Sequence, residues 1–145
     1  MSFCLRLPIK QPHFDQIEKG DKLVDGRIFY DSYRRKFKQG LLKIGSHLYF
    51  VMGKRVVIKQ LNSWLEYKGG FRAMLVGEGM SVCLPHLRST DIDAGVALYH
   101  SVKEDYEELA EKNNVLALRF GDLPLSRTEV LSLKVCCVSV LRDVA

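Results

Sequence analysis

The sequence predicts an α+β fold, a small mixed β-barrel with short helices at its ends. Apolar runs rich in β-branched residues occur early in the chain and again after residue 113, helical patterns lie between them, and no βαβ unit repeats. The chain has 145 residues, of which 47% are hydrophobic and 27% are charged. These values are typical of one soluble globular domain with a core of its own.

The first part of the chain reads as strand, helix and strand. Apolar and charged residues alternate in "FCLRLPIK" (3–10), which predicts a half-buried strand. A short helix should follow, with Pro12 in its first turn, and Gly20 suits the left-handed residue that ends it. "KLVDGRIF" (22–29) then reads as a strand or turn, and "YDSYRRKFKQG" (30–40) as a polar loop.

Two apolar runs in the middle of the chain, "SHLYFVM" (46–52) and "KRVVIKQLNSWLEY" (54–67), predict paired central strands. The connection around Gly53 is short enough for a hairpin. Three helices should follow, the first over 69–79, the second capped by Ser89 or Thr90, and the third started by a capping box of Ser101 and Glu104. "NVLALRF" (114–120) restores the alternation of a strand.

The tail contains another β-rich run, "LSLKVCCVSVL" (131–141). It predicts either an added edge strand or a segment buried in a homodimer. The division expected from the sequence is therefore a domain over 1–122 and a C-terminal extension over 123–145.

Charge is unevenly distributed along the chain. Residues 1–75 carry 15 Lys and Arg against 6 Asp and Glu, whereas residues 76–145 carry 7 against 11. An anionic partner such as nucleic acid would suit the basic half, and a solvated surface of uneven charge would explain it equally well. No apolar stretch is long enough to span a bilayer, so we expect no membrane contact and a cytoplasmic or nuclear location.

The four cysteines and four histidines show no metal-binding spacing, so we expect neither a zinc site nor another cofactor. The cysteines are expected to be buried thiols. Trp64, the single tryptophan, reads as a core residue or as a platform on which a base stacks.

The start of the chain carries a spaced motif, Gly20-x-Lys22-x-x-Asp25-x-Arg27. Together with the strand and helix before it, with "FRAMLVGEG" (71–79) and with the strand at 114–120, this motif resembles the ASCH family, relatives of the PUA-like RNA-binding barrels. The resemblance covers roughly residues 3–121. It implies a PUA-like barrel and a ligand cleft at the motif.

The resemblance also implies a choice of activities. Some ASCH-like proteins are amidohydrolases acting on acylated cytidine and others are ribonucleases, and the family's catalytic lysine falls on Lys22. Asp25 stands where the family has glutamate or threonine, and a glutamate near a helix end matches Glu78. Lys22, Asp25 and Glu78 are thus the catalytic candidates of a metal-independent hydrolase, with Arg27 beside them. Asp25 and Arg27 could instead form an ion pair that only locks the barrel mouth, because alternate strand residues share a face.

The segment after the motif interleaves aromatic and cationic side chains. Such a pattern is typical of single-stranded RNA recognition, where rings stack on bases and cations meet phosphates. We therefore expect RNA or a modified nucleoside as the partner; a hydrolase on the same cleft and a protein-interaction adaptor using the tail are the alternatives. Besides Arg27, the candidate ligand-binding residues are Tyr30, Tyr33, Arg34, Arg35, Lys36 and Lys38.

Overall fold

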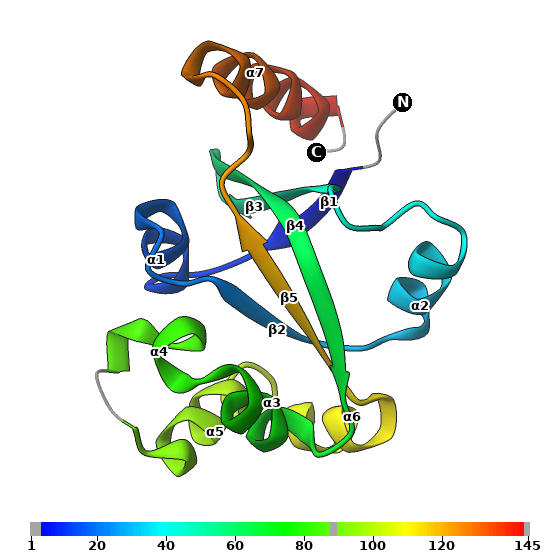
Figure 1. Ribbon diagram of the computed structural model, residues 1–145, viewed down its shortest axis with the longest axis vertical. Helices are drawn as coiled ribbons and strands as arrows, with labels where there is room; N and C mark the ends of the chain where they lie inside the picture. Colours follow the sequence, from blue (N-terminus) through cyan, green and yellow to red (C-terminus); the bar gives the residue numbers. More distant parts are fainter. Residues whose placement is uncertain (1–3, 88–89, 144–145) are drawn as a thin grey trace.

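The computed structural model of the chain describes residues 4–87 and 90–143. Within them, five strands form one curled sheet whose shape is that of a half-barrel (Figure 1). The strands are β1 (Cys4–Pro8), β2 (Val24–Ile28), β3 (His47–Met52), β4 (Arg55–Tyr67) and β5 (Val115–Gly121). The predicted mixed α+β architecture is confirmed at this level.

The sheet has the order β1-β3-β4-β5-β2. β1 and β3 pair in parallel, and the other pairs are antiparallel, including the predicted β3–β4 hairpin that closes with Met52 opposite Arg55. β1 and β2 therefore form the two edges of the sheet. The side chain of Arg27 connects these edges, because its Nη2 donates a hydrogen bond of 3.0 Å to the carbonyl oxygen of Pro8.

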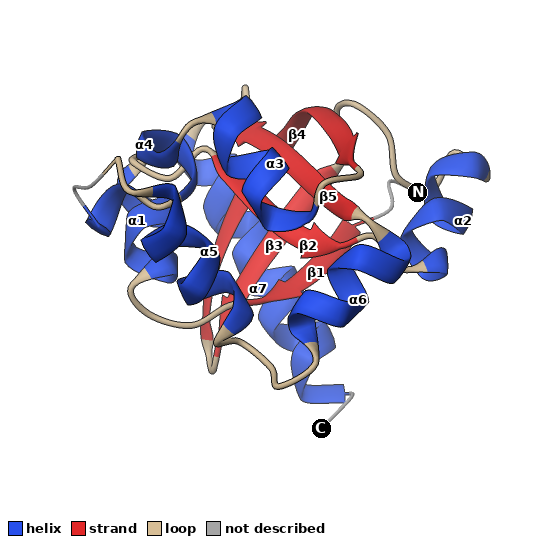
Figure 2. Cartoon of the chain, turned by 90° about the horizontal axis from the view of Figure 1, so that it is seen from below, coloured by secondary structure: helices blue, strands red, loops and turns tan. Residues whose placement is uncertain are grey.

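The helices gather around the two ends and the flanks of the half-barrel (Figures 1 and 2). Figure 1 shows α7 beyond one end of the sheet and the group α3–α6 beyond the other, with α1 and α2 on opposite flanks. The bounds are α1 (His13–Lys19), α2 (Asp31–Lys38), α3 (Gly70–Glu78), α4 (Met80–Cys83), α5 (Ile92–His100), α6 (Tyr106–Asn113) and α7 (Arg127–Asp143), with a 3₁₀ turn at Pro85–Leu87.

Two apolar cores hold these layers together. Alternate side chains of the strands, such as Leu48 and Phe50, pack inside the half-barrel against Phe14 and Ile17 of α1. The second core lies between the sheet and the α3–α6 group and is centred on Phe71. Because successive residues of a strand point to opposite faces, the same strands can serve both cores. The space between the two cores is where the candidate site forms.

The segment predicted as a polar loop is instead a helix, α2. Its residues Tyr33 and Phe37, four positions apart, pack against the half-barrel core and so give the segment a helical apolar stripe. The cationic residues between them are compatible with a helix, since Arg and Lys have good helix propensity. Charge density alone therefore led to the wrong assignment.

The tail is also a helix, α7, where an added edge strand was one of the two predictions. Val130 and Leu133, three residues apart, pack against a small cluster formed by β3, β4 and Leu123. This contact needs a helical face, and it overrides the β propensity of the valines in the run. The predicted burial of the tail in a homodimer stays a prediction.

Two predicted helix starts are displaced. The helix expected from a capping box at Ser101 begins at Tyr106, because α5 runs to His100 and Ser101 caps its C-terminus. α5 itself is capped by Asp91, whose side chain accepts a hydrogen bond from the backbone N–H of Asp93, rather than by Thr90; Ser89 lies outside the described residues.

The cysteine prediction holds for one residue and not for another. Cys83 is buried in the second core, as expected, whereas Cys4 is exposed on β1. The side chains of Cys136 and Cys137 lie outside the described residues. Among the described residues, no helix combines the length and apolar character that crossing a bilayer requires.

Candidate functional site

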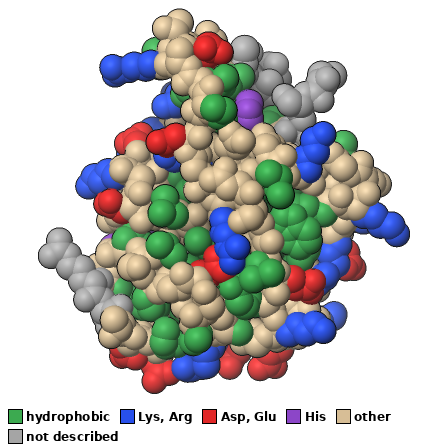
Figure 3. Space-filling view, viewed as in Figure 1, with side chains coloured by type: hydrophobic (Ala, Val, Ile, Leu, Met, Phe, Trp, Pro, Cys, Tyr) green, Lys and Arg blue, Asp and Glu red, His purple; other side chains and the backbone are tan. Residues whose placement is uncertain are grey.

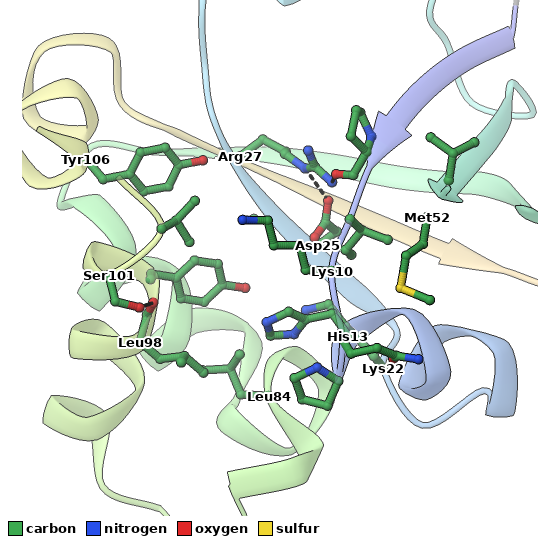
Figure 4. A pocket seen from close by; sticks show the side chains of 18 of the residues that line it. Lys10, His13, Lys22, Asp25, Arg27, Met52, Leu84, Leu98, Ser101 and Tyr106 are labelled. Atoms are coloured by element: carbon green, nitrogen blue, oxygen red, sulfur yellow. Dashed lines mark hydrogen bonds and ion pairs between the residues drawn. The ribbon is translucent and has the colours of Figure 1, made fainter. Parts of the chain in front are cut away.

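A cavity of about 640 Å³ opens between the half-barrel and the α5–α6 segment (Figure 4). Its walls come from the end of β1 and the loop after it, from β2, from the β3–β4 turn and from residues 98–106. Cavities of roughly 300–1,000 Å³ are typical of small-molecule sites. The motif residues Lys22, Asp25 and Arg27 all line this cavity, so the structure brings together the three side chains that the sequence singled out.

Lys22 is held inside the protein by the segment that follows α1. Gly20 ends α1 in the left-handed conformation, with φ +83°, and the backbone N–H groups of Asp21 and Lys22 both donate to Gln16 O. The next residue, Leu23, donates to Val82 O and ties the segment to α4. Lys22 is consequently placed between α1 and α4 with its side chain turned inward.

The Lys22 side chain is only 1% exposed although it ends in an amine. Its Nζ donates a hydrogen bond to the carbonyl oxygen of Cys83, the one acceptor that it finds among the described residues. Burial lowers the pKa of Lys22, and the nearby Asp25 carboxylate opposes this effect. A buried amine with donor capacity left over favours a ligand that brings a hydrogen-bond acceptor.

Asp25 and Arg27 form the ion pair that the strand parity predicted. Arg27 Nε lies 2.6 Å from Asp25 Oδ2, and the two side chains are 19% and 7% exposed. Burial lowers the pKa of Arg27, but the charge and hydrogen bond of Asp25 raise it more, so the guanidinium is held as a cation. Because the pair also borders the cavity, it combines a structural contact across the sheet edges with a polar surface for a ligand.

His13 adds a group that sequence analysis treated only as a non-ligand of zinc. It is the first residue of α1 and lines the cavity, and its ring meets that of His86 edge-to-face with centroids 5.3 Å apart. Burial and then the charge of Lys22 lower its pKa to about 4, so the imidazole is neutral at pH 7. Its Nδ1 is buried and has no hydrogen-bond partner among the described residues.

Aromatic side chains from the helical group form the opposite wall. Tyr99 and Tyr106 line the cavity and lie on either side of Phe71, with ring centroids 4.4 and 5.4 Å from it and nearly parallel planes. This three-ring stack fixes both tyrosines. Burial raises the pKa of Tyr106 to about 12, so its phenol stays protonated and can donate at neutral pH. Figure 4 shows Tyr106 facing the motif residues across the cavity.

Glu78, the third catalytic candidate, is not among the residues that line this cavity. Its carboxylate is 3% exposed and accepts two hydrogen bonds of 2.6 Å from Arg119, and the Tyr67 hydroxyl donates a third. The hydrogen bonds from Arg119 lower the pKa of Glu78 against the effect of burial. The carboxylate therefore links α3, β4 and β5, and a catalytic role for it would need a water or substrate to reach it outside the cavity lining.

The candidate ligand-binding residues on α2 lie outside the cavity lining. Arg34 forms a two-pronged ion pair with Glu66 and also donates to Asn113 O, so its guanidinium is already committed. Lys36 lies over the ring of Tyr33 with Nζ 5.6 Å from the centroid. Exposed residues of the set are Tyr30, Arg35 and Lys38.

Chemically, the cavity offers donors, one carboxylate and flat aromatic walls. Lys10, Lys22 and Arg27 are cationic lining residues and Asp25 is the anionic one, so the lining carries net positive charge. Among the described residues, no group of three or more His, Cys, Asp and Glu side chains is placed to hold a metal ion. Such an arrangement suits a ligand that has a planar ring and hydrogen-bonding edges.

Solved structures share this fold, among them the two that follow. The hypothetical protein PH0355 is 23% identical, with a TM-score of 0.67 over 83% of this chain and 100% of its own. Protein PF0455 from Pyrococcus furiosus is 24% identical, with a TM-score of 0.61 over 85% of this chain and 100% of its own. No protein-family model matches the sequence, and neither does any curated protein. The likeness supports the fold, and the ASCH resemblance stays a prediction.

The sequence pointed to the motif side of the cavity and not to the rest of its lining, which includes Tyr99 and Tyr106. A usable signal for His13 exists, namely a histidine directly after the proline that starts a helix next to the motif. Nothing local in the sequence shows that residues 98–106 lie opposite residues 8–27.

Proposed function

We propose that the cavity binds a nucleoside unit, either a modified nucleoside or one nucleotide of an RNA. The observation that carries this proposal is the convergence of Lys22, Asp25 and Arg27 on one 640 Å³ cavity with tyrosines on the facing wall. A nucleobase needs a flat apolar slot and paired donors and acceptors at its edge. Lys22 and Arg27 supply donors, and Asp25 supplies an acceptor.

The first experiment measures binding of nucleosides by calorimetry, with cytidine, N4-acetylcytidine, uridine, adenosine and guanosine as probes. We expect saturable binding of at least one, and Lys22→Met should weaken it by roughly 10- to 100-fold, because a hydrogen bond to a charged group contributes about 1.5–3 kcal/mol. Lys19→Met, on an exposed face of α1, is the matched control and should leave binding unchanged. Absence of binding by all five probes would contradict the proposal.

A hydrolase is the second candidate, and the state of Lys22 favours it. Lys22 lines the cavity and is 1% exposed, and this burial lowers the pKa of its amine, which favours the neutral form that can take a proton from water more than solvent would. In hydrolysis of N4-acetylcytidine, the water oxygen would bond to the acetyl carbon, the bond from that carbon to N4 would break, and N4 would receive the proton. Cytidine and acetate are then the only products.

Chromatographic detection of cytidine separates the two candidates. If the chain is a hydrolase, wild-type protein releases cytidine and Lys22→Met does not, whereas Glu78→Gln tests whether the buried carboxylate takes part. If N4-acetylcytidine binds and is recovered intact after many hours, the cavity is a binding site and the hydrolase candidate is wrong.

A further inference from the structure

A second surface with features of nucleic-acid recognition lies on α2 and β4, outside the cavity. We define the aromatic surface as Phe29, Phe37 and Trp64. Phe37 of α2 stacks on Trp64 of β4 with ring centroids 4.1 Å apart, and Phe29 meets both rings edge-on. Figure 3 shows hydrophobic atoms gathered on the molecular face between β4 and α2, with Lys and Arg atoms beside them.

Trp64 is held rigidly and remains 37% exposed. Phe37 stacks on the indole with an angle of 27° between the ring planes. Phe29 is 2% exposed and supports both rings from the core, where Arg34 lies 4.1 Å from its centroid. A tryptophan that only fills the core would be covered, whereas more than a third of this residue is accessible to solvent.

Exposed cations lie on α2, which carries Phe37, and in the loop after it. Arg35 and Lys38 of α2 are exposed, and so is Lys43 in the loop that follows. Arg34 is neutralised by Glu66, so the free positive charge belongs to these exposed residues. An indole face beside several unpaired lysine and arginine side chains matches a strand of bases and phosphates. A protein helix would instead call for a broader apolar groove.

α2 also connects the aromatic surface with the cavity. Tyr33 is one turn before Phe37 on the same helical face, about 6 Å along the helix axis. Phe29 of the aromatic surface lies two residues after Arg27, which lines the cavity, and α2 begins at Asp31, two residues after Phe29. The helix therefore begins near the cavity residues and runs to Trp64.

From this placement we infer that the ligand is a single-stranded polynucleotide: one nucleotide enters the cavity, a neighbouring base stacks on Trp64, and phosphates lie along Arg35 and Lys38. The inference rests on the proposed function of the cavity and narrows it, because a free nucleoside could not reach both places. Specific contacts would come from the cavity, and the aromatic surface would add affinity with little preference for sequence.

The chain offers its own probe, since Trp64 is its single tryptophan. The protein is titrated with a mixed-sequence 10-nucleotide RNA and with the DNA of the same sequence, and both should quench the tryptophan fluorescence. The oligonucleotide that binds with the higher affinity identifies the preferred sugar. Free cytidine or any nucleoside that binds the cavity should leave the emission unchanged. No quenching by either oligonucleotide at low salt would overturn the inference.

Variants measured by anisotropy of a labelled oligonucleotide provide the second arm. Trp64→Ala should weaken oligonucleotide binding roughly 5- to 100-fold, the range of one base-aromatic stack of about 1–3 kcal/mol, and should leave nucleoside binding intact. Trp64→Phe keeps a ring and the packing on Phe37, so it should recover most of the affinity. Recovery by Phe but not by Ala excludes a general folding defect.

Two double variants with reversed charges provide a matched comparison. Arg35→Glu with Lys38→Glu should weaken binding and reduce its salt dependence, whereas Lys19→Glu with Arg127→Glu, which changes net charge equally on α1 and α7, should have a much smaller effect. Equal effects of the two pairs would overturn the inference. If nucleosides bind and oligonucleotides do not, only this inference is refuted. If Lys22→Met leaves oligonucleotide affinity unchanged, the cavity proposal is refuted.

Discussion

Among the described residues, two arginine–carboxylate pairs have a buried carboxylate, and their surroundings differ. Asp25–Arg27 borders a cavity, and the amine of Lys22 nearby has a single acceptor among the described residues. Glu78–Arg119 is completed by the Tyr67 hydroxyl and lies outside the cavity lining. The same type of ion pair therefore occurs in two settings. All the partners of Glu78–Arg119 come from the protein, whereas the surroundings of Asp25–Arg27 retain hydrogen-bonding capacity that a ligand can use. The predictions below test this distinction, from the largest expected effect to the smallest.

Glu78→Ala should produce the largest loss of stability. It removes a carboxylate that is 3% exposed and leaves Arg119 and Tyr67 without their acceptor. Removing one partner of a buried pair costs about 3–5 kcal/mol, and because Arg119 is 40% exposed we expect about 2–3 kcal/mol in urea unfolding. Glu66→Ala, which breaks a more exposed pair with Arg34, should cost less than about 1 kcal/mol. Equal losses would contradict the distinction.

Gly77→Ala and Gly26→Ala compare the packing of the two centres. A Cβ at Gly77 would lie 2.5 Å from the hydroxyl oxygen of Tyr67 and 2.7–2.9 Å from atoms of its ring, and Glu78 accepts a hydrogen bond from this hydroxyl. A Cβ at Gly26 would meet the flexible end of Met74 at 2.6–2.7 Å. We expect about 2 kcal/mol of destabilisation for Gly77→Ala and about half of that for Gly26→Ala, measured by thermal unfolding. The reverse order would show that the cavity side is the more rigid one.

Acidification should act on the cavity side through His13. Its pKa is about 4 in the folded protein against 6.5 in the unfolded chain, so the unfolded state binds more protons between these values. Stability is therefore lost as the pH falls from 6.5 to 4. The difference between wild type and His13→Gln isolates this contribution, about 1–2 kcal/mol after allowing for partial solvation. Parallel pH profiles of the two proteins would contradict the assignment.

Lys22→Met should have the smallest effect on folding and a large one on binding. Burial lowers the pKa of Lys22, which means that the ammonium form is less favourable in the folded protein than in the unfolded chain. This cost to stability is present at neutral pH and disappears as the pH rises above the ordinary pKa of lysine. Replacing it by a side chain of similar volume should change the free energy of unfolding at pH 7 by no more than about 1 kcal/mol, in the stabilising direction. A loss of more than 1 kcal/mol in urea unfolding would assign Lys22 to the structural class of Glu78.

Much of the fold could be predicted from the sequence, because the strands show alternating apolar and polar residues and many β-branched side chains. The hairpin at Gly53, the left-handed Gly20 and the ion pair of Asp25 with Arg27 all follow from local chemistry. Local sequence patterns gave wrong predictions where packing against distant parts of the chain determines the secondary structure. α2 and α7 are helices because Phe37 and Leu133 find partners far away in the sequence, and no property of the segments themselves specifies those partners.

The candidate site, like the fold, could be predicted from the sequence only in part. The resemblance to the ASCH family implied a ligand cleft at Lys22, Asp25 and Arg27, and these three residues line one cavity. The position of Glu78 outside the cavity lining could not be foreseen, because it depends on Arg119, 41 residues later in the chain. Tyr99 and Tyr106 likewise join the site only through the packing of the helical group on the sheet.

The walls of the cavity are drawn from segments scattered between residues 8 and 106, and two of them belong to the unpaired edges of the sheet. No contiguous fragment of moderate length can therefore reproduce the site. Ligand affinity should appear late in refolding, together with the docking of the helical group on the sheet, and should be lost in the first partial opening that separates them. α7 supplies none of the described lining residues, which makes the extension a place where tags or fusions can be attached while recognition is preserved.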